Sequence, residues 1–280
     1  MVLRGRPPGE VPAKARACPA CNHKGVSIGY YRSTVLEAGR PGVKAAPRDA
    51  RRIVLNETNL FSPSEYTAAL LLYLRKHPAR VHASRALEMG PGSGVVMATL
   101  LALGAQSALG IELEALAVQA TQKLLDQEGL QANASLLQGD MWGVCGDARF
   151  DLVVTNLPQF AAEHIEGDGR LPTWSAGGPD GRRCVDQFLK GLSRHLAPGG
   201  LAVMTHNVFL DFAKTQLMAD ALGLQARVAY CASAPLPAYK LASMTPEVLA
   251  RFNGLGIHKM GDFWFVDFDL VEVSWKHEGA

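Results

Sequence analysis

The stretch that decides the fold is residues 85–94, which read Arg-Ala-Leu-Glu-Met-Gly-Pro-Gly-Ser-Gly. An apolar run that contains one acidic residue, Glu88, leads into glycines at every second position, Gly90, Gly92 and Gly94. A helix-like apolar segment follows at 95–101. This order predicts a buried strand that passes through a tight glycine turn into the start of a helix. Because glycine has no Cβ, a ligand can lie directly against the backbone of such a turn.

Beyond this turn the chain alternates between strand-like and helix-like segments. The strand-like segments of the first part lie at 85–89, 107–113, 134–137, 150–155 and 201–205. The alternation predicts an α/β fold, in which a doubly wound, mostly parallel sheet of seven strands carries helices on both faces. The last two strand-like segments, 225–231 and 263–273, have no crossover helix between them, so we expect an antiparallel pair at one edge.

The chain divides into a basic leader and a main domain. Residues 1–52 contain eleven Lys or Arg and three Asp or Glu, a balance of +8, which leaves −6 for the other 228 residues because the whole chain carries +2. We expect residues 1–60 to form a partly disordered N-terminal extension with a β-hairpin, which could reach an acidic partner. Residues 61–280 should form the main domain, with a helical insert at about 238–259.

Composition points to a cytoplasmic protein that does not enter membranes. No run approaches the ~20 apolar residues of a membrane span, and the N-terminus lacks the apolar core of a signal peptide. The five cysteines are scattered and odd in number, which favours reduced thiols. Cys18 and Cys21 form a single C-x-x-C pair, whereas a structural zinc site needs four ligands, so we predict no metal.

Four predicted strand ends carry polar or glycine-rich signatures at the edge where open α/β sheets bind ligands. Glu112 follows the glycine turn by about 20 residues, a spacing at which a carboxylate accepts ribose hydroxyls. Asp140 and Asn156 follow the third and fourth strands. A dinucleotide site would need G-x-G-x-x-G around a pyrophosphate. Here the third glycine comes one residue early, and Glu88 would repel a pyrophosphate but suits an ammonium group.

Together these strand ends resemble the class I S-adenosylmethionine-dependent methyltransferases, over roughly residues 61–273. The resemblance implies that S-adenosyl-L-methionine is the cofactor and that Glu88 and the glycine turn hold its methionine part. It also implies that Glu112 takes the ribose and that Asp140 meets the adenine amino group. Met141 or Trp142 would pack on the adenine ring.

Residues 155–160, Thr-Asn-Leu-Pro-Gln-Phe, are similar to the N-P-P-Y/F motif of the amino-methylating branch of that family. An amide or aryl amino nitrogen is a poor nucleophile because its lone pair is delocalised. By the resemblance, the carboxamide oxygen of Asn156 and the carbonyl of Leu157 each accept one N–H, which aims the lone pair at the sulfonium methyl. Catalysis would then consist mostly of positioning.

Two positions depart from the motif. Leu157 replaces the first proline, and Gln159 stands where an aromatic ring would stack on a planar acceptor. Other side chains are therefore candidates for contacting the substrate: Phe160, Trp174, Tyr66 and, after the fifth strand, His206.

The segment 176–181, Ala-Gly-Gly-Pro-Asp-Gly, is similar to a stretch of the release-factor glutamine methyltransferases, although the leader does not resemble their helical N-terminal domain. The prediction is N-methylation of a small-molecule acceptor, for example a specialised metabolite. A protein glutamine or an RNA guanine remains an alternative acceptor, reached through the basic leader.

Two further alternatives involve no acceptor. In the first, Asn156 holds the cofactor's own amino group, which closes a four-membered ring to azetidine-2-carboxylate and releases methylthioadenosine. In the second, the protein binds the cofactor without catalysis.

Overall fold

The computed structural model describes residues 62–165 and 174–276, and its centre is a single mixed sheet. Seven strands lie in the order β3-β2-β1-β4-β5-β8-β6, and the short β7 pairs with β8. The parallel strands are β1 (Arg85–Met89), β2 (Ser107–Glu112), β3 (Ala134–Gln138), β4 (Phe150–Thr155) and β5 (Leu196–Asn207). The predicted α/β sheet is confirmed. Its central strands are apolar on both faces because helices cover both sides.

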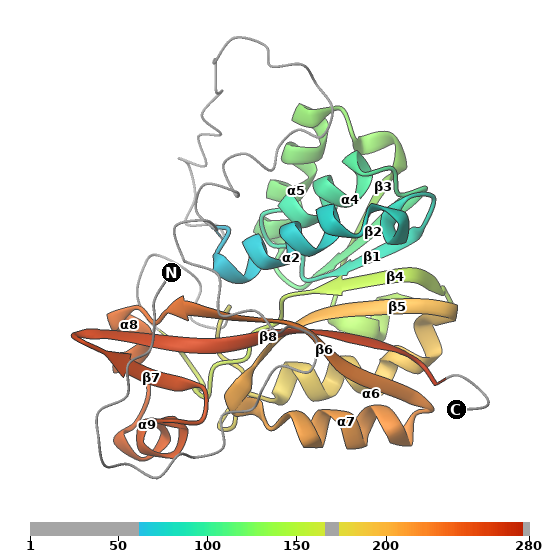
Figure 1. Ribbon diagram of the computed structural model, residues 1–280. Helices are drawn as coiled ribbons and strands as arrows, with labels where there is room; N and C mark the ends of the chain where they lie inside the picture. The colour runs from blue at the N-terminus through green and yellow to red at the C-terminus, as the bar shows by residue number, and fades with distance from the viewer. Residues whose placement is uncertain (1–61, 166–173, 277–280) are drawn as a thin grey trace.

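Helices form one layer on each face of the sheet (Figure 1). One layer holds α2 (Glu65–Lys76), the short α3 (Pro78–Val81), α4 (Val95–Ala102) and α5 (Ala115–Glu128). The other holds α6 (Arg183–His195) and α7 (Phe212–Ala221). Short 3₁₀ turns lie at Gln131–Asn133, Met141–Val144 and Val208–Leu210. In α6 the buried residues Val185, Phe188, Leu189 and Leu192 recur at helical spacing, so one stripe of the helix faces the sheet.

The antiparallel end of the sheet is formed by β6 (Leu224–Pro235) and β8 (Phe263–Trp275). The predicted antiparallel pair is thus confirmed, and β8 lies between β5 and β6. The last β5–β8 pair joins Asn207 to Phe268, so residues 263–267 of β8 continue past the carboxyl end of β5. There they pair with the end of β6 and with β7.

We call residues 233–267 the arm, because they extend the antiparallel end beyond the carboxyl end of β5 (Figure 1). The arm contains the predicted insert at 238–259. Two short helices, α8 (Ala238–Ala242) and α9 (Pro246–Phe252), form its first part, as expected. Its end is a strand, β7 (Ile257–Met260), where a helix was expected. The start of β8 thus has a strand partner on each side, β6 on one and β7 on the other.

The rest of the predicted organisation falls partly outside the structure. The N-terminal extension, its hairpin and the Cys18–Cys21 pair lie outside the described residues. Within 62–165 and 174–276, no helix is both long and apolar enough to cross a membrane.

Candidate functional site

The glycine turn between β1 and α4 has the left-handed backbone that only glycine adopts readily. The φ angles are 75° at Gly90, 54° at Gly92 and 78° at Gly94. A Cβ built on Gly90 would meet no described atom within 4 Å, so the turn is open at this position. A Cβ on Gly94 would lie 2.8 Å from Cγ2 of Thr121 on α5. Gly90 therefore leaves room for a ligand, whereas Gly94 allows two helices to approach.

Glu112, at the end of β2, is tied to this turn. Its Oε2 accepts a hydrogen bond from the Gly92 amide at 3.0 Å, and its Oε1 accepts one from the Glu114 amide at 3.1 Å. Burial raises the pKa of this carboxyl, and the backbone donors partly offset that effect. The fold thus brings Glu112 and the glycine turn together, as the sequence predicted.

Glu88, just before the turn, is a buried acid with an unsatisfied oxygen. Its side chain is 5% exposed, and its Oε2 has no hydrogen-bond partner among the described residues. Burial raises the pKa of this carboxyl well above the usual value; the Met97 amide opposes the rise and the charge of Glu112 adds to it. A buried polar atom without a partner is costly. A ligand with an ammonium group beside Gly90 would supply the partner, so the residues present fit the methionine end of S-adenosylmethionine.

The end of β3 presents Asp140 and Met141. Asp140 is exposed, and Oδ2 of its carboxylate lies 3.4 Å from Nε2 of Gln187. Met141 has a left-handed backbone, with φ of 44°. Trp142 is directed towards α6, where its Nε1–H donates to the Phe188 carbonyl at 2.9 Å. Of the two residues expected beside the adenine ring, Trp142 is therefore engaged by α6.

The loop after β4 carries both oxygens that the motif assigns to an N–H donor. Oδ1 of Asn156 accepts a hydrogen bond from the Thr205 hydroxyl at 2.8 Å. The Leu157 carbonyl lies 3.3 Å from Nε2 of Gln159. Asn156 is partly exposed and Leu157 is buried. Both carbonyl oxygens have two lone pairs, so each can accept one further hydrogen bond.

Gln159 does not face an acceptor, although it occupies the place of the motif's ring. Its side chain is 3% exposed. Its Nε2 donates to the Thr205 hydroxyl at 2.9 Å, and its Oε1 accepts from the Asn207 amide at 2.6 Å. Sequence reasoning missed Thr205 and Asn207, and it treated Gln159 only as the absence of a ring.

Two aromatic candidates for substrate binding are engaged inside the protein. Phe160 is 3% exposed, and its ring lies under Nζ of Lys240 from α8, 4.3 Å from the ring centroid. Tyr66 is 7% exposed and stacks on Phe268 at 4.1 Å. The Tyr66 hydroxyl donates to Oδ1 of Asn207 at 2.6 Å, and burial raises its pKa. Tyr66 thus supports the Gln159 contacts from α2. Neither ring is presented to a substrate.

His206 and Trp174 were also expected to contact substrate. His206 is fully buried under α7, where its Nε2 lies 2.9 Å from the Thr215 hydroxyl. Burial and the nearby Arg182 cation lower its pKa to about 3, so the ring is neutral. The structure therefore does not bring His206 to the site. Trp174 is partly buried and precedes Ser175, whose carbonyl accepts the Phe160 amide at 2.9 Å, so Trp174 adjoins the Asn156 loop.

Sequence reasoning also missed Arg182, the first of two arginines at the start of α6. It is 4% exposed, and its guanidinium donates to Thr215 at 3.1 Å and to Asp186 at 2.9 Å. A further hydrogen bond reaches the Leu210 carbonyl. Arg182 therefore fixes the segment between β5 and α7, behind the site.

The segment 176–181 packs against the Asn156 loop through two glycines. The Gly177 amide donates to the Phe160 carbonyl at 2.7 Å, and the Gly178 amide donates to the Ala162 carbonyl at 3.1 Å. A Cβ on Gly177 would lie 2.5 Å from the Gly181 carbonyl oxygen and 2.7 Å from Cα of Gln159. These obstacles are backbone atoms, which cannot move aside cheaply.

Gly177→Ala is therefore expected to lower the free energy of unfolding by about 1–3 kcal/mol, the usual cost of overpacking. Gly143→Ala is the matched control, because a Cβ there meets no described atom within 4 Å. Chemical denaturation of both variants measures the difference. Equal stability of the two would show that 176–181 is not packed tightly on Gln159.

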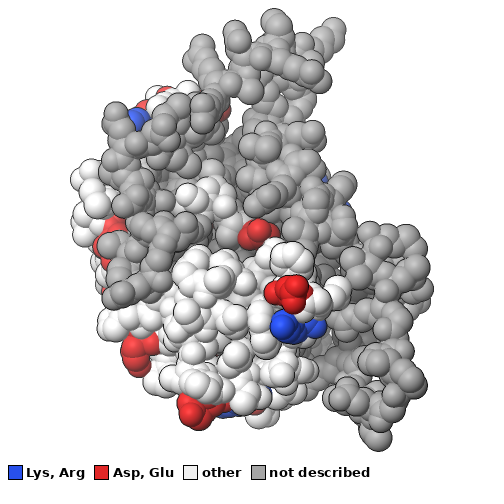
Figure 2. All heavy atoms as spheres, turned by 90° about the vertical axis from the view of Figure 1, so that its left-hand side faces the viewer, with Lys and Arg blue, Asp and Glu red and all other residues white. Residues whose placement is uncertain are grey.

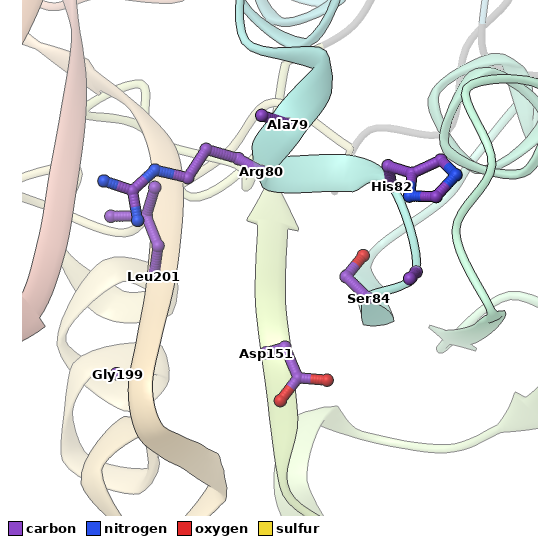
Figure 3. Close-up of a pocket in the computed structure, with 8 residues that line it drawn as sticks. Ala79, Arg80, His82, Ser84, Asp151, Gly199 and Leu201 are labelled. Carbon is purple, nitrogen blue, oxygen red and sulfur yellow. The ribbon is translucent and has the colours of Figure 1, made fainter.

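A separate pocket of about 250 Å³ lies at the amino ends of the central strands, away from the glycine turn (Figure 3). Arg80, His82, Ser84 and Asp151 contribute to its lining, near the starts of β1 and β4. It contains none of the predicted site residues. Among the described residues, no group of His, Cys, Asp or Glu could hold a metal ion.

The family model and the curated proteins that match this chain are described as methyltransferases. A family model described as "Methyltransferase small domain" matches residues 51–169. The release factor glutamine methyltransferase of Caulobacter vibrioides is 31% identical over 150 residues, which cover 51% of this chain and 52% of that protein. The ribosomal protein uL3 glutamine methyltransferase of Bradyrhizobium diazoefficiens is 31% identical over 134 residues, or 44% of this chain and 40% of that protein. This chain thus spans about half the length of these curated relatives.

Solved structures share the fold. The YcgJ protein of Bacillus subtilis superposes with a TM-score of 0.52 and 15% identity, over 75% of this chain and 99% of that one.

Proposed function

Because this chain carries a class I S-adenosylmethionine-dependent methyltransferase domain, we propose that it transfers a methyl group from S-adenosylmethionine to a nitrogen atom of a small-molecule acceptor. The observation that carries this proposal is the register of two neighbouring strands. Met89 of β1 pairs with Thr155 of β4, and the Thr155 hydroxyl donates to the Met89 carbonyl at 2.8 Å. The next residues of the two strands are Gly90 and Asn156. The glycine turn and the residue that carries the candidate acceptor-binding oxygen therefore follow neighbouring strands.

In the proposed reaction the cofactor supplies a methyl group on a sulfonium, and the chain binds and orients the two reactants. Glu88 accepts the ammonium of the cofactor's methionine end, and Glu112 accepts its ribose hydroxyls. The Asn156 oxygen accepts one N–H of the acceptor, and the Leu157 carbonyl accepts a second. These two contacts hold the nitrogen lone pair in the direction of attack, which is the main source of catalysis when no strong base is needed.

The acceptor is an amine or amide that needs no aromatic stacking partner at residue 159. Gln159 and Phe160 are both buried, so this part of the loop offers no ring to a flat group. Figure 2 views the end of the molecule that carries the arm, and the described surface there is mostly uncharged, with few Lys and Arg. RNA binding relies on basic side chains that neutralise phosphates. The described part of this face therefore offers little basic charge to RNA.

The glutamine side chain of a protein is a second candidate acceptor. The names of both curated relatives refer to glutamine methylation of a protein, and a glutamine amide is itself a planar nitrogen acceptor. The segment 176–181 also favours a glutamine acceptor. It is similar to a stretch of the release-factor glutamine methyltransferases, and it packs on the Asn156 loop.

The test uses cofactor labelled in its methyl group, with four separate additions. These are a set of small amines and primary amides, a glutamine-containing peptide, a guanine-containing RNA, and no acceptor. We expect label in a small-molecule nitrogen. Label confined to peptide or RNA would replace the proposed acceptor class. Methylthioadenosine formed without acceptor would indicate ring closure, and binding without any product would indicate a non-catalytic protein.

A further inference from the structure

A continuous line of hydrogen bonds runs from α2 to the Asn156 side chain. It begins at the Tyr66 hydroxyl, which bonds to the side chain of Asn207, and it continues from the Asn207 backbone amide to Gln159. From there it passes through Thr205 and ends at Oδ1 of Asn156. The four side chains before Asn156 are all at least nine-tenths buried. The line therefore joins the loop after β4 to the end of β5 and to α2 through the protein interior.

One backbone amide determines the orientation of the Gln159 carboxamide in this line. The Asn207 N–H can only donate, so the Gln159 atom 2.6 Å away must be the oxygen, Oε1. The other end of that carboxamide, Nε2, then donates to the Thr205 hydroxyl at 2.9 Å. The Thr205 hydroxyl donates its own hydrogen to Oδ1 of Asn156, 2.8 Å away. In this arrangement the oxygen of the Asn156 carboxamide faces Thr205.

We propose that Gln159 and Thr205 are positioning residues, which fix the orientation of the Asn156 carboxamide toward the acceptor nitrogen. A side-chain amide rotates freely between two nearly isosteric orientations unless its hydrogen bonds distinguish oxygen from nitrogen. In this protein the donor at Thr205 makes that distinction. In the place of the motif's stacking ring, Gln159 thus has a different role. Through Thr205 it orients Asn156, which binds the acceptor, and it does not contact the acceptor itself.

This proposal rests on the proposed function, because Asn156 is assigned there as the acceptor-binding residue. It explains how the Asn156 loop can keep the orientation of the Asn156 carboxamide without an aromatic ring at residue 159. A misplaced catalytic group commonly costs about 100-fold in rate. We therefore expect loss of the Thr205 donor to lower kcat by about 10- to 100-fold without changing cofactor affinity.

The first experiment compares Thr205→Val, which removes the hydroxyl, with Thr205→Ser, which keeps it. Thr99→Val on α4 is the control, because it removes a threonine hydroxyl that bonds only to its own helix, at the Val95 carbonyl. We expect Thr205→Val alone to lower kcat. In the protein with S-adenosylhomocysteine bound, it should also speed hydrogen exchange of the Gln159 side-chain amide, measured by NMR. Equal exchange and equal kcat in both Thr205 variants would overturn the proposal.

The second experiment reverses the direction of the hydrogen bond between residue 159 and Thr205 while keeping the shape of the side chain at residue 159. In Gln159→Glu an ionised carboxylate can only accept, so the Thr205 hydroxyl turns toward it and leaves Asn156. A protonated carboxyl donates through its O–H and restores the original direction. We therefore expect kcat of Gln159→Glu to rise, relative to the wild type, as pH falls through the pKa of the introduced carboxyl. A constant ratio of the two rates across pH would contradict the proposal.

The two experiments separate this proposal from the proposed function. Hydrogen exchange needs no acceptor, so its outcome stands even if no acceptor is methylated. If an acceptor is methylated but neither variant alters kcat, the positioning roles fail while the methyltransferase assignment remains.

Discussion

Glu88→Gln is expected to weaken the binding of S-adenosylmethionine by between about 30-fold and about 4,000-fold. The carboxylate oxygen of Glu88 that lacks a described partner is buried next to the glycine turn. Removing one member of a buried charge pair typically costs about 2–5 kcal/mol, and each 1.4 kcal/mol is about tenfold in affinity. Gln keeps the shape of the side chain and removes only the charge, so titration calorimetry with the cofactor measures the charge effect.

The control for this variant is Glu128→Gln, at the exposed end of α5, which removes the same charge far along the helix. We expect its dissociation constant to equal that of the wild type. If Glu88→Gln also bound the cofactor with wild-type affinity, Glu88 would not hold the ammonium group.

The pH dependence of cofactor binding follows from the state of Glu88 in the free protein. Burial raises its pKa well above the usual 4.5, so the free protein retains this proton over a range in which the unfolded chain has lost it. Pairing with an ammonium requires the ionised form. We therefore expect affinity to fall as pH decreases through the raised pKa, and binding to release a proton. Calorimetry in buffers of different ionisation enthalpy detects that release, and Glu88→Gln should abolish it.

The same group affects the stability of the cofactor-free protein in the opposite sense. Where a folded-state pKa is raised, the associated stability is complete below the unfolded pKa and is lost as pH rises through the folded pKa. The free energy of unfolding of the wild type should therefore decline relative to Glu88→Gln as pH rises above 4.5. Denaturation across pH checks this, and parallel curves for the two proteins would refute it.

The sequence predicts the arrangement of the candidate cofactor side because that side consists of short contiguous segments. The run from Glu88 to Gly94 contains an acid, a turn and a helix start in order, and each has its own local signature. Glu112 was predicted from its spacing after the turn, and in the structure it ends a strand that pairs residue by residue with β1. In a parallel sheet, adjacent strand ends are neighbours, so strand order alone brings these residues together.

The acceptor side depends on partners far apart in the chain. Gln159 bonds to Thr205 and Asn207, which are 46 and 48 residues away. A glutamine in a loop gives no local sign that it will be buried. The same holds for Arg182, whose partner Thr215 lies 33 residues further on. One signal was present: the apolar strand β5 ends in three polar residues, Thr205, His206 and Asn207.

Those three residues alternate between the two faces of the strand. Thr205 and Asn207 both contact Gln159 on one face, whereas His206 contacts Thr215 of α7 on the other. Alternation along β5 would have separated His206 from the site, but it could not have identified Gln159 as the shared partner.

Asn156→Ala is expected to lower kcat for methyl transfer by about 100- to 1,000-fold, the usual loss when one aligned hydrogen-bonding group is removed from a reacting centre. The Leu157 carbonyl remains, but a single contact leaves the acceptor nitrogen free to rotate its lone pair away from the methyl group. Asn133→Ala is the matched control, since Asn133 is exposed in the 3₁₀ turn before β3. Steady-state rates and calorimetry on the same preparations separate kcat from cofactor binding.

The combination of these two readouts decides what Asn156 binds. If it orients an acceptor, the cofactor dissociation constant should change by less than about threefold, because the proposed partner of the cofactor's ammonium is Glu88 and cofactor affinity is a separate term from kcat. If Asn156 instead holds the cofactor's own amino group for ring closure, cofactor affinity and methylthioadenosine release should fall together. Unchanged kcat with unchanged affinity would remove Asn156 from the reaction. In that case the Thr205–Asn156 bond would be a structural contact of the loop.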